Sequence, residues 1–380
     1  GSTSAIRGGT VRRMRETDAM TTVGEVPRLP AGLAEELDRQ AERCRPSSPL
    51  YGFLLRELAG DVRAGGIAAG LLGPYDNEPT AFVPGLRLMA AVHALVLGGQ
   101  APRLAAYYPS AGGHGPPDRA WPEFRRVLHE HTERIAELVA QPVQTNETGR
   151  SAALYGGLLT IAAATGLPIR LHEIGASAGL NLRADRFAYR MGGRLLGDPQ
   201  SALVLDEPWD GLPDAPEGTQ VRVIERLGCD LRPIDPATPE GALRLKSLTW
   251  ADPARIERIG HAVAIARATP ATVDAANADE WLASRLADPV PGAVSVVWHS
   301  VVRQYVEPDR WRRVGAILAQ AGDAATSAAP VAHLSFEPDI GPDGLYTFAV
   351  RLTLWPGGRS RLLAIAAAHG IPTRWQTEER

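Results

Sequence analysis

The sequence predicts a doubly wound α/β fold, in which helices cover both faces of a largely parallel sheet. Two observations support this prediction. From Pro168 onward, short runs rich in aliphatic residues alternate with helical stretches, as they do when helices connect parallel strands. The first run ends in an acidic residue and then turns through a Gly-x-Ser-x-Gly string. Such a turn lets a ligand approach the backbone closely, so we expect this loop to face the ligand.

Strand-like and helix-like stretches can be placed along the whole second half of the chain. The patterns predict strands at 169–174, 186–191, 221–225, 271–275, 293–298, 330–336 and 345–354, and helices at 254–267 and 309–321. The first half reads as helical, with helices at 31–45, 51–58, 86–98, 122–140 and 147–165 and a long loop at 107–117. We therefore predict a helical N-terminal cap domain at 29–145 and an α/β domain at 146–380. Residues 1–28 are polar and unpatterned, and we expect a disordered or tag-like segment there.

Composition narrows the classes of function. The 380 residues carry a formal net charge of −3, which argues against an extended nucleic-acid surface. The longest apolar run is too short to cross a bilayer, so no membrane partner is expected. Two unpaired cysteines disfavour a disulfide framework and fit a reducing, cytoplasmic setting. The nine histidines show no metal-ligand spacing, and no metal is predicted.

The glycine turn carries the sharpest functional signal. Glu173 ends the strand, and Gly175, Ser177, Gly179 and Asn181 follow at the head of an expected helix. Free amides at a helix N-terminus would favour an anionic group. Glu173 would accept hydrogen bonds from a ligand ammonium or cap the turn. Two alternatives remain open: a strained esterase turn with a nucleophilic serine, served by His299 or His333, and a turn that only packs a helix onto the sheet.

Three further sets of residues are candidates for the site. Asn146 and Arg150 lie where a loop enters a helix; Arg150 would bind a sulfate, phosphate or carboxylate, or form a surface ion pair. His299 and Glu337 follow strands, where the carboxyl edge of an open sheet binds ligands, and are candidates for base or acid; each alone can equally be structural. Hydroxyl groups in the helical half would line the pocket roof or pack between domains: Ser48, Tyr51, Tyr108 and Ser110.

Several motifs together resemble one bacterial family. Asn146-Glu147-Thr148-Gly149-Arg150 and the segment His172–Asn181 resemble bacterial domain-of-unknown-function family 2332. The resemblance extends to Ser48-Pro49-Leu50-Tyr51, Tyr107-Tyr108-Pro109-Ser110, Trp298–Val302 and His333–Glu337, and so covers the chain from about residue 35. It implies a fold like that of class I S-adenosylmethionine-dependent methyltransferases behind a helical N-terminal region. Some relatives are associated with aziridine formation by internal displacement of a sulfate ester, helped by a small partner protein.

Two departures from the methyltransferase pattern shape the functional expectation. The second strand of such folds ends in an acidic residue that holds the ribose, whereas the segment read as the second strand ends in Tyr189-Arg190-Met191-Gly192-Gly193. After the third strand, Ala276-Asn277 stands where the family has Gly-Asp. These departures weaken the case for the cofactor, and the family resemblance implies a biosynthetic enzyme that closes an aziridine ring without one, on an amino-acid-like substrate with a sulfate-type leaving group. The alternatives are an S-adenosylmethionine-dependent methyltransferase and a non-catalytic scaffold that binds a small accessory protein.

Overall fold

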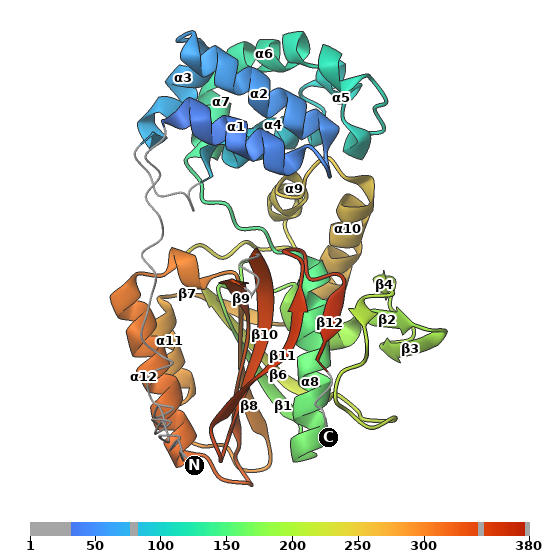
Figure 1. Ribbon diagram of the computed structural model, residues 1–380, viewed down its shortest axis with the longest axis vertical. Coiled ribbons are helices and arrows are strands. Elements are labelled where there is room, and N and C mark those ends of the chain that lie inside the picture. The colour runs from blue at the N-terminus through green and yellow to red at the C-terminus, as the bar shows by residue number, and fades with distance from the viewer. Residues whose placement is uncertain (1–31, 77–82, 341–345, 377–380) are drawn as a thin grey trace, which may run out of the picture.

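The computed structural model describes residues 32–76, 83–340 and 346–376. The predicted tag-like segment 1–28 lies outside these ranges. A group of helices forms one end of the molecule and a large sheet with flanking helices forms the other (Figure 1). The fold is therefore mixed α/β, as the sequence predicts. In the described ranges no helix has the length and apolar character needed to cross a bilayer.

The helical end is built from the first half of the chain. Its α-helices are α1 (Leu33–Cys44), α2 (Pro49–Arg63), α3 (Ile67–Leu72), α4 (Pro84–Leu97), α5 (Pro102–Ala105), α6 (Trp121–Glu130) and α7 (Thr132–Val139). They bury a common apolar core, which also takes in Ala251 from the connection between α9 (Pro239–Ser247) and α10 (Pro253–Ala268). The boundary between the two predicted domains, near residue 145, stays a prediction.

The large sheet has nine strands in the order β5-β12-β11-β10-β9-β8-β1-β6-β7. A parallel block is formed by β1 (Ile169–Ile174), β6 (Val223–Asp230), β7 (Thr272–Ala275), β8 (Val294–Ser300) and β9 (Val331–Ile340). An antiparallel extension follows, with β10 (Tyr346–Trp355), β11 (Arg359–Ala366) and β12 (Thr373–Trp375). At the edge, β5 (Trp209–Asp210) pairs with β12 in parallel. The strand order reverses between β1 and β8, and ligands bind at such reversals in open α/β sheets.

Helices cover both faces of the sheet. On one face, α8 (Ser151–Thr165) and α10 contribute to the main apolar core. On the other, α11 (Ala278–Arg285) and α12 (Pro308–Ala324) pack against Ile174, Cys229 and Val297. β1 and β8 are buried along nearly their whole length, as central parallel strands are, whereas β6 and β7 are partly exposed.

A small second sheet stands beside the main one. It pairs β2 (Ala188–Met191) with β3 (Arg194–Gly197) and β4 (Val204–Asp206). The rings of Tyr155, Tyr189 and Trp209 stack nearly parallel between this sheet and α8, with 4.4 Å between the centroids of Tyr155 and Tyr189. The strand predicted at 186–191 exists, but it is not the second strand of the main sheet.

Other departures from the expectations are local. The helix predicted at 122–140 is two helices that meet at His131, and the one predicted at 147–165 begins with the 3₁₀ turn η5 (Thr148–Arg150). Helices α9 and α11 and strands β3, β4, β5, β11 and β12 were not predicted. The expected helix after the glycine turn is absent: the segment Asn181–Arg186 forms the 3₁₀ stretch η6.

Candidate functional site

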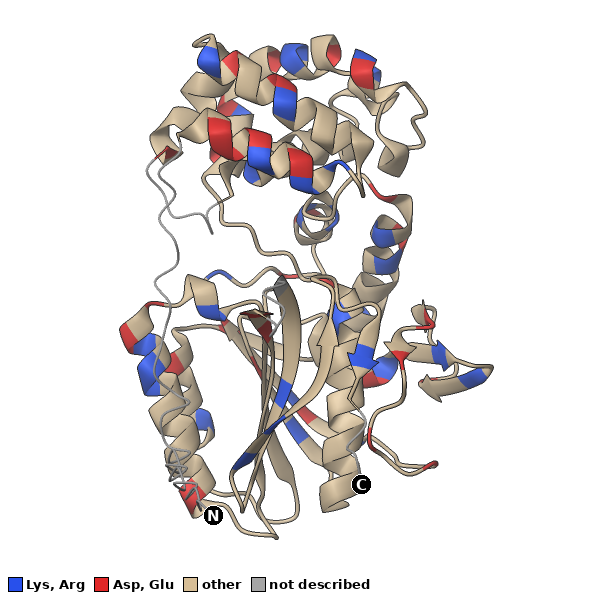
Figure 2. Ribbon diagram, in the orientation of Figure 1, with Lys and Arg blue, Asp and Glu red and all other residues tan. Residues whose placement is uncertain are grey.

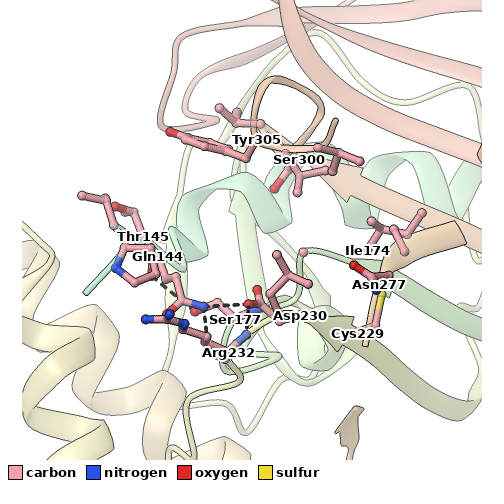
Figure 3. Close-up of a pocket in the computed structure, with 18 of the residues that line it drawn as sticks. Gln144, Thr145, Ile174, Ser177, Cys229, Asp230, Arg232, Asn277, Ser300 and Tyr305 are labelled. Carbon is pink, nitrogen blue, oxygen red and sulfur yellow. Dashed lines mark hydrogen bonds between the residues drawn. The ribbon is translucent and has the colours of Figure 1, made fainter. Parts of the chain in front are cut away.

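A cavity of about 640 Å³ opens where the parallel strands end (Figure 3). Ile174, Cys229 and Ser300 bring β1, β6 and β8 to its floor. The linker from α7 to η5 forms another wall, and Arg87 of α4 also contributes, so the cavity lies between the helical end and the sheet. The remaining residues of the lining are Ala140, Pro142, Val143, Gln144, Thr145, Arg150, Gly175, Ser177, Asp230, Leu231, Arg232, Ala276, Asn277, Ala278, Val301, Val302, Tyr305, Val306, Glu307 and Arg310.

The glycine turn reaches the cavity through Gly175 and Ser177 only. Gly175, Ser177 and Gly179 all have positive φ, and for Ser177, at +53°, this conformation is strained. Gly175 must lack a side chain because a Cβ there would lie 2.3 Å from Cγ2 of Val302. Gly179 lies behind the cavity, where a Cβ would meet Arg183.

Four amides of the turn are not free, contrary to the sequence prediction. Those of Gly175 and Ala176 donate to Cys229 O at 2.9 and 3.0 Å. The amide of Ser177 donates to Asp230 Oδ2 at 3.0 Å, and that of Gly179 donates to Ala176 O. Since the protein itself satisfies these donors and no α-helix begins here, the turn does not form the predicted anion cradle.

The motif Asn146–Arg150 braces this turn. Asn146 Oδ1 accepts from the Leu180 amide at 2.9 Å. Asn181 Nδ2 donates to Glu147 O at 3.3 Å, while Asn181 Oδ1 accepts from Ser151 Oγ at 2.7 Å. Asn146 and Asn181 are both buried and do not line the cavity. The two most distinctive motifs of the sequence therefore hold each other, and these two asparagines are structural in this geometry.

Glu147 anchors the same segment from behind. Its carboxylate lies 2.6 Å from Arg255 Nη2, 3.6 Å from Arg258 Nη1 and 3.5 Å from His369 Nδ1. It also accepts from the Gly149 amide at 3.0 Å. Burial opposes ionisation, but Arg255 and the other donors hold the pKa of Glu147 below its ordinary value.

Asp230 is the acidic residue that the sequence analysis missed. It ends β6, the true neighbour of β1, and faces the cavity next to the glycine turn (Figure 3). Its Oδ1 accepts from Gln144 Nε2 at 2.7 Å and from the Arg232 amide at 2.9 Å, and its Oδ2 accepts from the Ser177 amide. The strand was predicted to stop at residue 225, because Glu225 and Arg226 interrupt the apolar run. Asp230 was therefore missed because the segment 186–191 was predicted as the second strand in place of β6.

Arg150 is the sequence-predicted site residue best placed for a ligand. Its Nε donates to Ala368 O at 3.1 Å and its guanidinium lies over the Phe336 ring, 5.8 Å from the centroid. Among the described residues its two terminal nitrogens have no hydrogen-bond or ion-pair partner, and the residue lines the cavity. Burial lowers the pKa of this guanidinium, whereas Glu147 and Glu337 oppose that effect. An anionic ligand would stabilise the positive charge of Arg150 further, in addition to Glu147 and Glu337.

Three other arginines line the cavity. Arg87 donates to the carbonyls of Val139 and Gln141, and Arg310 pairs with Asp279 at 2.8 Å. Arg232 is exposed at the rim, near Gln144 and Asp230 (Figure 3). The lining contains two carboxylates, of which Asp230 already accepts three hydrogen bonds. The cavity is therefore biased toward anionic ligands.

Glu173 points away from this cavity. It is 2% exposed, and its Oε2 is buried without a hydrogen-bond partner in the described structure. Burial raises its pKa to about 8, although Trp298 and Arg183 act in the opposite direction. At neutral pH the neutral acid is therefore favoured. A carboxyl group in this state is unsuited to bind a ligand ammonium, which was its predicted role, and a poor general base.

His299 and Glu337 form one hydrogen-bonded unit directly behind the cavity wall. Nδ1 of His299 donates to Glu337 Oε1 at 2.7 Å, and the same oxygen accepts from the amides of Val302 and Arg303 at 3.1 and 3.4 Å. On the other side of the ring, 2.9 Å separates Nε2 of His299 from Nε2 of His333. The sequence correctly placed both residues at the carboxyl edge of the sheet, but neither lines the cavity.

The esterase alternative is not supported by this geometry. Ser177 Oγ donates to Gln144 O at 3.3 Å rather than to a base. His299 is bound to Glu337 and His333, so neither histidine is paired with the serine. In the described structure there is no group of three His, Cys, Asp or Glu side chains that could hold a metal ion.

The hydroxyl residues of the helical half do not form the cavity roof. Ser48 caps α2, where its Oγ accepts from the Tyr51 amide at 3.3 Å. Ser110 donates to Nε2 of His93 at 2.8 Å, while Nδ1 of His93 donates to Ser247 O. Tyr51 and Tyr108 are buried, with ring centroids 6.4 Å apart. Their positions agree with the alternative prediction, in which these residues pack inside the protein instead of lining the pocket.

Comparison with known proteins identifies the family of the chain. No curated protein and no solved structure matches it. A family model described as "Uncharacterized protein conserved in bacteria (DUF2332)" matches residues 34–375. Since that match spans most of the sequence, the chain belongs to the DUF2332 family of bacterial proteins.

Proposed function

We propose that this protein is a small-molecule biosynthetic enzyme that closes a ring by internal displacement of an anionic leaving group. The observation that carries the proposal is Arg150, which lines the cavity at the carboxyl edge of the sheet and whose terminal nitrogens have no partner in the described structure. A guanidinium binds a sulfate ester through two parallel hydrogen bonds. An amino-acid-like substrate with such a group fits a cavity of about 640 Å³.

The proposed step is a substitution within one molecule. The substrate amine attacks a neighbouring carbon, the new C–N bond forms as the C–O bond breaks, and sulfate leaves with the electron pair. Because the amine and the carbon belong to one molecule, the protein contributes by holding the bonds between them in attack geometry. Arg150 would stabilise the charge that develops on the leaving oxygen, with Arg232 at the rim as a second cation.

The ammonium proton of the product needs an acceptor. The predicted bases Glu173 and His299 do not reach the cavity. Glu307 does: it is exposed at the rim and has no ion-pair partner in the described part of the chain. We therefore assign the role of base to Glu307, because Asp230 is already occupied by three donors.

A direct test measures sulfate release from a 1,2-amino alcohol O-sulfate of an α-amino acid. We expect the wild type to release sulfate faster than buffer, and Arg150→Gln to reduce the rate by about 10²–10³. Arg312→Gln is the matched control, since Arg312 is an exposed arginine on α12 that pairs with Asp309. Equal rates for Arg150→Gln and Arg312→Gln would refute the role of Arg150, and no release by the wild type would refute the reaction.

A second candidate, S-adenosylmethionine-dependent methyl transfer, is favoured by Asp230. The parallel block has the strand order β7-β6-β1-β8-β9, which a methyltransferase-like sheet would also have, and Asp230 ends the strand beside β1. Asp230 would hold the ribose and Asn277 the adenine, and the cofactor would supply an electrophilic methyl group. Against this, three hydrogen bonds already use most of the acceptor capacity of Asp230.

Calorimetric titration with S-adenosylhomocysteine separates the two candidates. The ring-closure proposal expects no binding at micromolar concentration and expects binding of inorganic sulfate that Arg150→Gln weakens. Micromolar binding of S-adenosylhomocysteine, weakened by Asp230→Asn, would instead support methyl transfer. A folded protein that binds neither compound would favour the scaffold alternative, in which a small accessory protein is the partner.

A further inference from the structure

Behind the cavity wall, three side chains form a continuous hydrogen-bonded chain. Glu337 and His333 come from β9, and His299 from β8, so the chain crosses from one parallel strand to the next. Glu337 Oε1 also holds the amides of Val302 and Arg303. Residues 300–303 thus receive their position in part from this carboxylate, and Ser300, Val301 and Val302 line the cavity.

This wall segment is under backbone strain. Val301 has a φ of +52°, which a β-branched residue rarely adopts. Its amide donates to Phe336 O at 2.9 Å, and Val302 presses against Gly175, where no Cβ fits. Such a conformation persists only when the surrounding contacts fix it. The contacts from Glu337 are therefore part of what keeps the wall in place.

The contact between the imidazoles of His299 and His333 limits which ring nitrogens can carry a proton. Two ring nitrogens at 2.9 Å form a hydrogen bond only when one proton lies between them. His299 Nδ1 must carry a proton in order to donate to Glu337. If His299 is neutral, its Nε2 accepts and His333 donates. If His299 takes up a proton, its Nε2 donates and His333 accepts through its other tautomer.

We propose that His333 is a positioning residue for the cavity wall: its neutral ring either donates to or accepts from His299, so residues 300–303 keep their place in both protonation states of His299. Burial lowers the pKa of His333 to about 3, with His299 acting in the same direction. A second proton between the rings is therefore disfavoured.

The groups packed around Glu337, His299 and His333 are compatible with a positioning role for His333. Trp311 of α12 covers the His299 ring edge-on, with 4.9 Å between centroids. The α12 arginines Arg310 and Arg313 are held by Asp279, and Arg312 is paired with Asp309. β10 places the uncharged Thr353 opposite His333 and Ala349 opposite Glu337. β10 also places Arg351 opposite Ser335, where it pairs with Asp339 at 2.7 Å. Arg150 interacts electrostatically with Glu337.

Two substitutions distinguish a hydrogen-bonding role from space filling. The amide of His333→Gln can donate or accept, depending on its orientation, and does not titrate; His333→Leu can do neither. The readout is amide hydrogen exchange of the peptide that contains residues 300–306, corrected for the intrinsic pH dependence, between pH 5 and 8. Exchange needs no ligand, so its result stands apart from the proposed function. His129→Gln, on α6, is the control histidine variant.

We expect wild type, His129→Gln and His333→Gln to protect the 300–306 segment equally across this range. His333→Leu should lower protection by about tenfold, because it leaves Nε2 of His299 without a hydrogen-bond partner. Protection of α8 should stay unchanged, which shows that the chain remains folded. If Leu protects the segment as well as Gln does, or if Gln fails as Leu does, the proposed role of His333 is wrong.

Discussion

Replacing Glu173 by glutamine should change how stability depends on pH. In the unfolded chain this carboxyl group ionises near its ordinary pKa of 4.5, whereas burial raises its pKa to about 8 in the folded protein. Between these values the folded state keeps a proton that the unfolded chain has released. The group therefore makes the free energy of unfolding fall as pH rises through this window.

The size of this effect follows from the shift. A change from 4.5 to about 8 corresponds to roughly 5 kcal/mol, at about 1.36 kcal/mol per unit. Glu173 is 2% exposed, so solvent screening does little to reduce it. Glutamine has no proton to lose. We expect the loss of stability between pH 5 and pH 8 to be smaller in Glu173→Gln than in the wild type by about 2–5 kcal/mol.

Urea unfolding at pH 5, 6.5 and 8, followed by circular dichroism, measures the required free energies. Glu225→Gln is the matched control with the opposite sign, because His172 and Arg170 lower the pKa of Glu225 to about 2. Its stabilisation is fully present above pH 4.5 and is lost only in more acid solution, so this variant should be weakened by the same amount at pH 5, 6.5 and 8. If the curve of Glu173→Gln runs parallel to that of the wild type, the buried neutral acid described above does not exist.

Three further outcomes follow from the structure. Glu147→Gln should lower the free energy of unfolding by about 3–5 kcal/mol in urea titrations, because it leaves Arg255 buried without its ion-pair partner; a loss below 1 kcal/mol would contradict this. Gly175→Ala should cost about 1–3 kcal/mol, measured by thermal unfolding, because it combines a positive φ with a clash against Val302; an unchanged midpoint would contradict it. Cys229 lines the cavity, yet burial raises the pKa of its thiol to about 12; Ellman's reagent at pH 8 should therefore modify it slowly until urea is added, and rapid reaction of the folded protein would oppose this.

The sequence predicted the parallel strands well because burial on both faces leaves a clear apolar pattern. It failed where pairing partners decide the outcome. The segment 188–191 has the same pattern as a central strand, and only its pairing with β3 and β4 shows that it belongs to another sheet. The error at β6 had the opposite cause, since Arg226 and Gly228 hide a strand that continues to Asp230.

The predicted site was partly right for a similar reason. Residue type and position at a strand end located Arg150, Gly175 and Ser177 at the cavity. Whether a backbone amide is free cannot be inferred from its own segment, because its acceptor is supplied from elsewhere. Here Asp230 lies 53 residues from Ser177 and Asn146 lies 34 residues from Leu180. These acceptors, distant in the sequence, occupy amides that the sequence predicted to be free for an anion.

The contact between the η5 segment and the turn after β11 has a consequence for biosynthesis. A Cβ on Gly149 would lie 2.4 Å from His369 O, and one on Gly370 would lie 2.6 Å from Arg150 Cα, so the two backbones touch. Arg150 also donates to Ala368 O. During translation, the ribosome releases residues 368–370 more than two hundred residues after Arg150. A nascent chain can therefore form the early helices and strands, but it can fix this guanidinium only after residues 368–370 have emerged.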